Sequence, residues 1–369
     1  MNKRVILYIP SLDGGGAERF IVRLANGLVD KGIHVILIVG NAVGPNLARV
    51  SSLVNLVDLK CERTYKVLPK LIKFLYKTEY DAFLSTLDHA NIISILAHIF
   101  LKKKSKLVIR QATIINKNNT KNGIKINLIL KLLMFLSKKA DFIVTTSKAM
   151  QKEFISESNI HEKKVVIIPN PIDIKEVNYL SKKDNMSDKE FYKGEIPLIV
   201  AVGRLEPVKG FEKLILAFEK LLKNRPAKLV ILGEGRLRPH LQKLVDELGI
   251  TNKVLMPGFI KNIYPYISNA EIFALTSDYE GFPNAMLEAM ACGINIVAFD
   301  CPGGVREILE DGKWGSLVPS GDIITLSQTI DSLLLEVSKN RNLPNVAQRA
   351  NDFSIETIVE KYIQIFFSK

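Results

Sequence analysis

Short apolar runs alternate with longer amphipathic stretches along most of the chain. The apolar runs are rich in β-branched residues, as the buried strands of parallel sheets are. The stretches between them repeat apolar residues at the three- and four-residue spacing of helices. This alternation predicts a parallel, doubly wound α/β sheet. Its strands are expected at residues 5–9, 35–39, 82–85, 107–109, 142–145 and 165–168.

The same alternation begins again at residue 198. Between the two series, residues 169–171 read Pro-Asn-Pro, and the two prolines disfavour a helix there. We therefore predict two domains, over residues 1–170 and 171–352, with a last amphipathic helix inside 353–369. In the second domain, strands are expected at 198–202, 228–232, 254–256, 272–275 and 295–298, and helices at 211–223 and 284–291.

Composition places the chain among globular proteins. Of its 369 residues, 47% are hydrophobic and 24% are charged, which argues against disorder and low complexity. Cys61, Cys292 and Cys301 show neither CxxC nor zinc-site spacing, so we expect no disulfide framework, and a cytoplasmic location suits the chain. No apolar run reaches 18 residues, which predicts no membrane span. The N-terminal run is expected to be a strand, not a signal peptide.

Charge is unevenly distributed along the chain. Residues 1–175 contain 28 Lys and Arg against 13 Asp and Glu, a net charge of +15, whereas the remaining residues contain 23 against 25, a net charge of −2. A basic half suits a phosphorylated substrate or an anionic membrane surface, and a solvated lysine-rich surface explains it equally simply. The lysines are scattered and no RRM, helix-turn-helix or zinc-finger pattern is present, so no nucleic-acid partner is expected.

One apolar stretch lies beside lysines in the basic half. Residues 126–136 read INLILKLLMFL, and Lys138 and Lys139 follow. A helix of this kind can lie in the headgroup region of an anionic membrane, where each nearby Lys contributes about 1 kcal/mol. A buried helix of the first domain is the other interpretation, and the sequence does not decide between them.

A glycine-rich segment directly follows the first predicted strand. Residues 14–18 read Gly-Gly-Gly-Ala-Glu. Glycines allow a tight turn and close approach to a ligand, and the helix that follows offers free N–H groups to an anion. The spacing differs from GxGxxG, so it does not predict a dinucleotide site. A tight turn without a ligand remains the alternative.

A second segment, residues 203–210, follows the first strand of the second domain and reads Gly-Arg-Leu-Glu-Pro-Val-Lys-Gly. Arg204 offers a planar fork to phosphate oxygens, and Lys209 offers a point charge. Two cations in one loop suit a diphosphate, although a solvated basic turn has the same composition.

A third segment, residues 280–288, reads Glu-Gly-Phe-Pro-Asn-Ala-Met-Leu-Glu. Pro283 suits the first turn of a helix, so Glu280 precedes the helix and Glu288 lies inside it. Carboxylates at such a helix start can accept hydrogen bonds from sugar hydroxyls, and the free N–H groups there can hold phosphate. For Glu288 alone, an ordinary surface position is the alternative.

Together these segments resemble glycosyltransferase family 4, whose members are retaining enzymes with the GT-B fold. The resemblance spans nearly the whole chain and implies two Rossmann-like domains facing a central cleft. The first would bind the acceptor, the second would bind the donor, and the final helix would cross back to the first. Its motifs are GGGAE (14–18), TTSKAM (145–150), IPNPID (168–173), VGRLEPVKG (202–210), LGEGRLRPHL (232–241), GFI (258–260) and EGFPNAMLEAMACG (280–293).

The resemblance implies a nucleotide-sugar donor, with UDP as the expected nucleotide. Arg204 and Lys209 would hold the diphosphate as it leaves, and Glu280 would contact the donor sugar. Gly281 and Phe282 would lie beside that sugar, with Glu288 on the ribose. The base pocket would be lined by Gly233, Glu234, Arg236, Phe259 and Ile260, and Gly15 and Gly16 would approach the donor phosphate from the first domain.

The expected chemistry follows from charge. Negative charge develops on the diphosphate as the glycosidic bond breaks, and preorganised cations lower that barrier. The chain contains no Asp-x-Asp, the pattern of metal-using glycosyltransferases, so neither a metal nor another cofactor is expected. In the retaining family the leaving phosphate oxygen is thought to take the acceptor proton, which makes a strong protein base unnecessary.

The acceptor side departs from the family. Many members carry a His after a strand of the first domain, whereas residues 108–113 here read Val-Ile-Arg-Gln-Ala-Thr. Arg110 and Gln111 are candidates for the same space, and neither can be assigned from the sequence. His89 is a further candidate for the cleft, and an ordinary position near a helix start explains it as well.

We therefore expect a retaining glycosyltransferase of the hexosyl type. Its acceptor is expected to be a lipid-linked, lipopolysaccharide, capsule or O-antigen saccharide, used at the cytoplasmic face of the membrane. Two alternatives remain open. A nucleotide-sugar epimerase on the same fold would release an epimerised donor without an acceptor, and a non-catalytic subunit would bind the donor without turnover.

Overall fold

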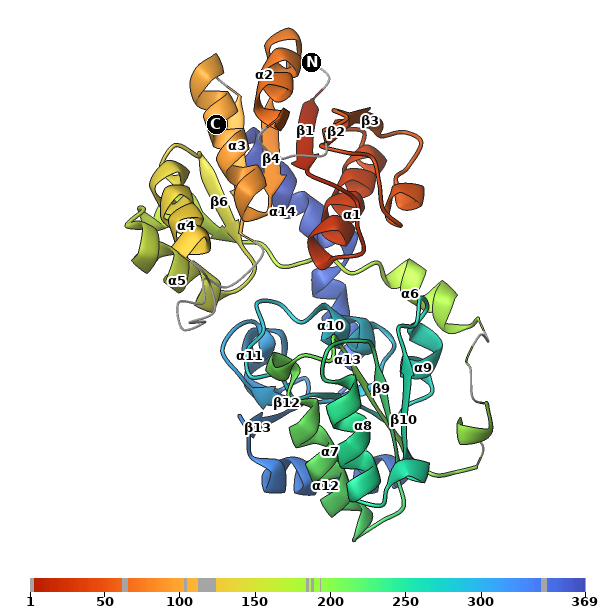
Figure 1. The fold of residues 1–369 in the computed structure, drawn as a ribbon. Coiled ribbons are helices and arrows are strands. Elements are labelled where there is room, and N and C mark those ends of the chain that lie inside the picture. The colour runs from red at the N-terminus through yellow and green to blue at the C-terminus, as the bar shows by residue number, and fades with distance from the viewer. Residues whose placement is uncertain are drawn as a thin grey trace. The chain divides into compact units, whose positions relative to one another are not determined.

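The chain forms two units in the computed structural model (Figure 1). The first unit is Met1–Pro171 together with Ile355–Lys369, and the second unit is Ile172–Ser354. These divisions lie within two residues of the predicted boundaries. The structure describes residues 3–61, 66–102, 105–111, 124–183, 186, 189–192, 194–339 and 344–368.

The first unit is built on a parallel sheet of seven strands in the order β3-β2-β1-β4-β5-β6-β7. Central strands are buried on both faces, and Val5 of β1 pairs with Val35 on one side and Ala82 on the other. The predicted strands are confirmed, and β3 at the sheet edge is an addition. The strands are β1 (Arg4–Ile9), β2 (His34–Val39), β3 (Asn55–Asp58), β4 (Ala82–Thr86), β5 (Lys106–Arg110), β6 (Phe142–Thr145) and β7 (Val165–Ile167).

Helices cover both faces of this sheet. Residues of α2, α3, α4 and α5 bury apolar side chains on one face, and residues of α1 and α14 do so on the other. Figure 1 shows α14, the end of the chain, beside α1. The helices are α1 (Gly16–Asp30), α2 (Val67–Lys77), α3 (Asp88–Leu101), α4 (Ile124–Ser137), α5 (Lys148–Ser158) and α14 (Ile355–Phe367).

Helix α14 completes the core of the first unit although it lies at the other end of the chain. Tyr362 and Phe366 are buried, and the ring of Tyr362 lies 5.7 Å from that of Phe20 on α1. Gly27 of α1 allows this close packing, because a side chain there would overlap Ile355 and Val359. The helix is therefore a structural part of the first unit.

The second unit contains a parallel six-stranded sheet in the order β10-β9-β8-β11-β12-β13. The five predicted strands are confirmed, and β13 is again an addition at an edge. The strands are β8 (Leu198–Val202), β9 (Lys228–Leu232), β10 (Val254–Gly258), β11 (Ile272–Leu275), β12 (Asn295–Asp300) and β13 (Ser316–Pro319).

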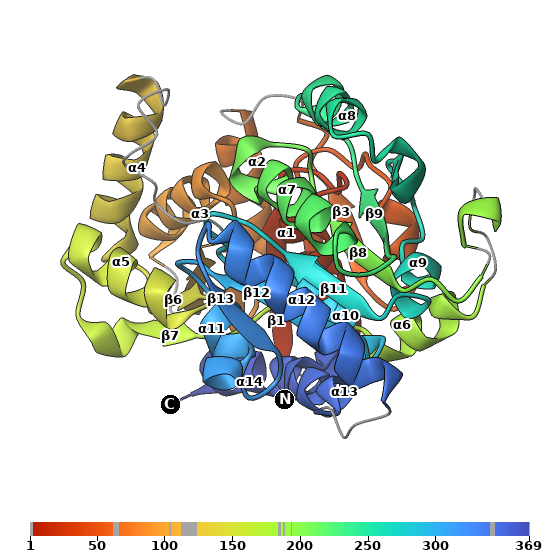
Figure 2. The same cartoon turned by 90° about the horizontal axis from the view of Figure 1, so that it is seen from below.

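Helices also cover both faces of the second sheet. Figure 2 shows α7 and α12 side by side, and with α8 they pack on one face. Five shorter helices pack on the other. The first group is α7 (Phe211–Leu222), α8 (Arg238–Glu247) and α12 (Ile323–Ser338), and the second is α6 (Ile174–Ser181), α9 (Tyr264–Ser268), α10 (Asn284–Ala291), α11 (Val305–Ile308) and α13 (Val346–Ala350).

In each sheet the strand order reverses beside the first strand of the unit, between β1 and β4 and between β8 and β11. Because all strands are parallel, the loops at their carboxyl ends gather along one edge. Ligands of doubly wound sheets bind at that edge, next to the reversal. The loops that follow β8 and β11 are the segments that the sequence singled out in the second domain.

Candidate active site

An ion pair joins the two loops at the reversal point of the second sheet. Lys209 lies in the loop after β8, and Glu280 lies in the loop after β11. The Lys209 Nζ is 2.5 Å from Glu280 Oε1, and the Ser277 hydroxyl donates to the same oxygen at 2.7 Å. Glu280 is only 8% exposed. Of Arg204, Lys209 and Glu280, the three residues expected at the diphosphate and the donor sugar, the structure thus brings Lys209 and Glu280 together.

Two hydrogen bonds to backbone carbonyls fix these two loops against each other. The Thr276 hydroxyl donates to the Lys209 carbonyl at 3.1 Å, and the Asp278 N–H donates to the Val208 carbonyl at 2.8 Å. Gly210 has φ of +61°, and a side chain there would overlap the Thr276 carbonyl. Lys209 therefore sits on a loop whose position is set by contacts with the loop after β11.

A third loop holds the Glu280 backbone. The Glu280 N–H donates to the Pro302 carbonyl at 3.0 Å, and the Gly304 N–H donates to the Glu280 carbonyl at 3.2 Å. Between them, Gly303 has φ of +125°, and a Cβ there would collide with the Glu280 carbonyl. Only glycine fits, because this φ is sterically closed to residues with a Cβ.

Arg204 differs from Lys209 in being exposed and open to a ligand. Among the described residues, its guanidinium has neither an ion-pair nor a hydrogen-bond partner. It lies directly after Gly203, the first residue beyond β8, whose N–H donates to the Leu232 carbonyl at 3.0 Å. The loop thus presents one exposed cation and one cation that is paired with a carboxylate.

The predicted base-pocket residues lie after β9 and β10. Gly233 packs against the Gly203 carbonyl with φ of +142°, and Leu205 N–H donates to the Glu234 carbonyl at 2.8 Å. Arg236 forms an ion pair with Glu206 at 2.7 Å. The loops after β8 and β9 therefore form one connected surface.

Two further side chains complete that surface. Glu234 forms an ion pair with Arg238 at 3.0 Å, and exposed pairs of this kind contribute little stability. After β10, the ring of Phe259 is 74% exposed, whereas Ile260 is partly buried. The exposed ring offers an apolar face to a ligand.

Glu288 occupies the second turn of α10 and is only 3% exposed. Its Oε1 lies 3.5 Å from the Tyr264 hydroxyl. Phe282, next to Gly281 in the preceding loop, is half-buried, with its ring 5.9 Å from that of Phe353. The carboxylate of Glu288 is therefore a buried group of the site, not the surface residue that was the alternative interpretation.

Two cysteines lie near these carboxylates. Burial raises the pKa of Cys301 to about 12, and the nearby charge of Glu280 adds to this shift. Burial likewise raises the pKa of Cys292 to about 12, with Glu288 contributing. Both thiols stay protonated near neutral pH, so neither is an activated nucleophile.

In the first unit, the glycine-rich segment forms the turn between β1 and α1. Gly15 caps α1 in an extended conformation, and Gly16 begins the helix. The Glu18 side chain folds back over the turn, so that a Cβ on Gly15 would overlap its carboxylate. Burial raises the pKa of Glu18.

Arg110 and Gln111, the candidates after β5, are both 2% exposed. The Arg110 guanidinium donates to the Thr86 hydroxyl at 3.1 Å and to the Asn170 side chain, and it lies 3.9 Å from the centre of the Phe20 ring. Arg110 is therefore enclosed by protein. Gln111 donates to Asp88 at 3.2 Å.

His89 lies exposed in the first turn of α3. Sequence reasoning missed Gly303 and Asp88, because their contacts join segments distant in sequence, and it missed Ser277, which donates to Glu280 within one loop. Within the described part of the chain, no group of three or more His, Cys, Asp or Glu side chains could bind a metal ion. No described helix is long and apolar enough to cross a membrane.

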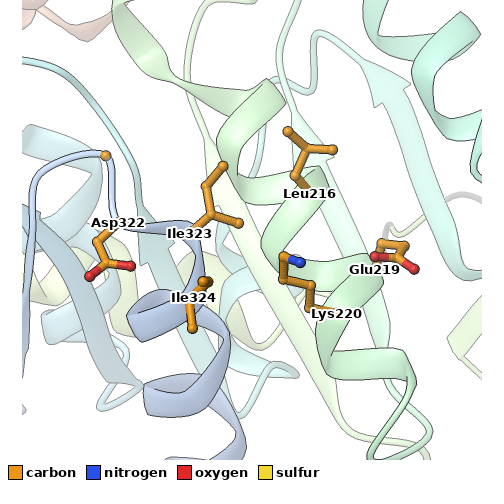
Figure 3. Close-up of a pocket in the computed structure, with 7 residues that line it drawn as sticks. Leu216, Glu219, Lys220, Asp322, Ile323 and Ile324 are labelled. Carbon is orange, nitrogen blue, oxygen red and sulfur yellow. The ribbon is translucent and has the colours of Figure 1, made fainter.

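A separate hollow of about 400 Å³ lies between α7 and the start of α12 (Figure 3). Both of its carboxylates have partners within the fold. Asp322 caps α12 by accepting from the Thr325 N–H at 2.9 Å, and Glu219 forms an ion pair with Lys223 at 2.9 Å. Leu216 and Ile324 line it as well. We assign no role to this hollow.

Comparison with known families covers both units. The family described as "Glycosyltransferase Family 4" matches residues 14–176, and the family described as "Glycosyl transferases group 1" matches residues 182–350. A Campylobacter jejuni enzyme named N-acetylgalactosamine-N,N'-diacetylbacillosaminyl-diphospho-undecaprenol 4-alpha-N-acetylgalactosaminyltransferase is 30% identical over 94% of each chain. The chain therefore belongs to the family 4 glycosyltransferases.

Other relatives and structures agree with this family and fold. A second Campylobacter jejuni enzyme is named GalNAc-alpha-(1->4)-GalNAc-alpha-(1->3)-diNAcBac-PP-undecaprenol alpha-1,4-N-acetyl-D-galactosaminyltransferase, and it is 27% identical over 98% of each chain. The structure of Anabaena HepE in complex with UDP superposes over the full length of both chains with a TM-score of 0.78 at 20% identity. The expected GT-B fold is thereby confirmed.

Proposed function

We propose that this glycosyltransferase moves a sugar, with retention of configuration, from a UDP-linked donor to a saccharide carried on a lipid diphosphate. The observation that carries the proposal is the Lys209–Glu280 pair beside exposed Arg204, at the reversal point of the second sheet. Two cations at this point suit the diphosphate of a nucleotide sugar.

The proposed chemistry depends on where the charge develops. As the bond between the anomeric carbon and the diphosphate breaks, negative charge grows on the phosphate oxygens. Arg204 and Lys209 stabilise that charge, and because Glu280 already holds the ammonium in place, little reorganisation is needed. The acceptor hydroxyl oxygen bonds to the anomeric carbon on the face from which the diphosphate leaves, and the leaving phosphate oxygen takes the hydroxyl proton, so the configuration is retained.

The remaining residues of the second unit bind the rest of the donor. Glu288 accepts hydrogen bonds from the ribose hydroxyls, and the exposed Phe259 ring packs on the base. The choice of UDP is supported by the Anabaena HepE complex, which is similar in fold. UDP-N-acetylgalactosamine is the first donor to test, because two relatives are named for transferring that sugar.

The apolar residues exposed on helix α4 favour an acceptor that is used at a membrane surface. Leu133 and Met134 are buried in the first unit, whereas Leu128, Leu132 and Phe135 are 66%, 44% and 70% exposed. Their spacing of four and three residues places these three side chains on one helix face. The sequence left a buried and an interfacial helix as alternatives, and the structure shows that α4 has both a buried and an exposed apolar face.

Charge complements that exposed face. Lys131, Lys138 and Lys139 are exposed on or just after α4. An apolar stripe beside lysines suits the headgroup region of an anionic membrane, so we propose peripheral binding of the first unit to such a surface. The two Campylobacter relatives are named for acceptors on undecaprenyl diphosphate, which agrees with this location.

A panel of UDP-, GDP- and ADP-sugars, first scored by thermal shift, tests the donor. Transfer is then followed with a diphospho-undecaprenol saccharide ending in N-acetylgalactosamine, and NMR of the product gives its anomeric configuration. We expect a shift with a UDP-sugar and an α-linked product. Transfer with inversion, or release of an epimerised nucleotide sugar without acceptor, would contradict the proposal.

A further inference from the structure

The loop that holds the Glu280 backbone joins β12 to α11 in the second unit. It packs closely on the segment that is expected beside the donor sugar. A Cβ on Gly303 would collide with the Glu280 carbonyl. A Cβ on Gly304 would lie 3.0 Å from the Phe282 ring and 3.1 Å from the Gly281 carbonyl. A change in the position of this loop would therefore displace the backbone of that segment.

An ion pair joins the two ends of this loop. Asp300 is the last residue of β12, and Arg306 is the second residue of α11. The Arg306 Nε donates to Asp300 Oδ1 at 3.0 Å, and Nη2 of the same guanidinium donates to Asp300 Oδ2. Two parallel hydrogen bonds between a planar guanidinium and a carboxylate fix both their distance and their orientation. The side chains therefore close the loop at its base.

Arg306 has a second partner outside the loop. Its Nη1 donates to Asp311 Oδ1 at 3.1 Å, and Asp311 lies in the turn after α11. The side chains of Arg306, Asp300 and Asp311 are 52%, 29% and 78% exposed. Ion pairs as exposed as these contribute little to stability. We therefore expect the pair with Asp300 to matter for the position of the loop more than for the stability of the unit.

We propose that the Asp300–Arg306 pair is a positioning pair that holds Glu280 where it contacts the donor sugar. The ion pair sets the loop, and the loop holds the Glu280 backbone through the Pro302 carbonyl and the Gly304 N–H. Neither member of the pair needs to touch the donor. This inference rests on the proposed transfer reaction and on the expected contact between Glu280 and the sugar.

The test compares the full-length wild type with Arg306→Met, Asp300→Asn and the double variant. Methionine removes the guanidinium, and asparagine replaces the oxygen that accepts from Nη2 by an amide nitrogen that cannot accept. Asp311→Asn is the matched control, because it alters the other partner of Arg306 and leaves the pair at the loop in place. We measure donor kcat/KM, the Kd for UDP, the Tm and hydrogen exchange at the Glu280 and Gly304 amides. The donor is the UDP-sugar that the panel selects, with UDP-N-acetylgalactosamine tested first.

For Arg306→Met and Asp300→Asn we expect donor kcat/KM to fall about 10- to 100-fold, because a small displacement of a substrate-positioning group suffices for such a loss. The Kd for UDP should rise by a smaller factor, since Glu280 acts on the diphosphate through Lys209. The double variant should lose no more than either single variant, because both side chains act through one contact. The Glu280 and Gly304 amides should exchange faster at a nearly unchanged Tm. The matched control should resemble the wild type in every measurement.

Three results would overturn the inference and leave the proposed function intact. Unchanged donor kcat/KM or unchanged amide exchange in Arg306→Met would show that the pair does not position Glu280. A loss in Arg306→Met beside wild-type kinetics in Asp300→Asn would show that Arg306 acts without the pair. Equal losses in donor kcat/KM and UDP binding, together with a fall in Tm, would show general destabilisation. A wild-type protein that transfers no sugar from any UDP-sugar would refute the proposed function and this inference with it.

Discussion

The ion pair between Lys209 and Glu280 allows a quantitative test by a double-mutant cycle. Lys209→Met removes the ammonium and keeps most of the stem, and Glu280→Gln removes the carboxylate charge with little change in shape. The Glu280 side chain is 10% exposed and that of Lys209 is 23% exposed. After Lys209→Met, the Ser277 hydroxyl remains as the partner of Glu280 Oε1.

The free energy of unfolding that is lost on breaking this ion pair should lie between two limits. Breaking a fully buried pair costs about 3–5 kcal/mol, and exposed pairs are worth about 0–1 kcal/mol. Because the Lys209 side chain is partly exposed to water, we expect Lys209→Met to lower the free energy of unfolding by about 2 kcal/mol. For a unit of this size that corresponds to a fall in Tm of roughly 4–8 °C. The coupling energy in the cycle should be about 1–2 kcal/mol.

The assay is urea unfolding of the wild type, the two single variants and the double variant. Stability is taken from the change in the midpoint urea concentration, provided that the slope m stays constant. The pair between Lys213 and Asp278 is a matched control, since it joins the same two regions with side chains that are 33% and 46% exposed. Its cycle should give a coupling below about 1 kcal/mol. Additive effects at Lys209 and Glu280, or coupling no larger than in the control, would refute the reasoning.

Three more outcomes are expected. Gly303→Ala should lower the free energy of unfolding by about 1–3 kcal/mol through backbone strain, and it should weaken UDP binding because the new side chain displaces the Glu280 carbonyl. Gly312 also has a positive φ but lies in open space, so Gly312→Ala should leave UDP binding unchanged. Leu128→Ser with Phe135→Ser should reduce sedimentation with vesicles containing anionic lipid, without lowering Tm, and unchanged sedimentation would contradict the membrane proposal. Phe366→Ala should lower the free energy of unfolding of the first unit by about 3–5 kcal/mol. Calorimetry should show the change in the unfolding transition of that unit only.

Much of the fold could be predicted because central parallel strands are buried on both faces and read as continuous apolar runs. The two strands that were missed, Asn55–Asp58 and Ser316–Pro319, lie at sheet edges, where several residues stay partly exposed. Their apolar signal is weak for that reason. The helix over 284–291 was predicted with its exact bounds, since Pro283 marks its start.

The candidate site could be predicted only as motifs. The sequence indicates that Lys209 and Glu280 follow strands of one sheet, but it does not indicate that the strands are neighbours, which sets their contact. Arg110 shows the limit more clearly. The sequence offers Arg110 as a candidate for the acceptor side without assigning it, whereas in the structure Phe20, Thr86 and Asn170 enclose it.

The position of α14 has a consequence for how the chain matures during synthesis. The second unit is one continuous segment, Ile172–Ser354, so it can fold as soon as it has left the ribosome. The first unit is encoded by both ends of the chain, and Tyr362 and Phe366 belong to its core. Although most of it is translated first, it can finish folding only after α14 has left the ribosome. Until then a nascent chain exposes the apolar face that α14 will cover, and chains cut short before residue 355 lack the helix that covers it.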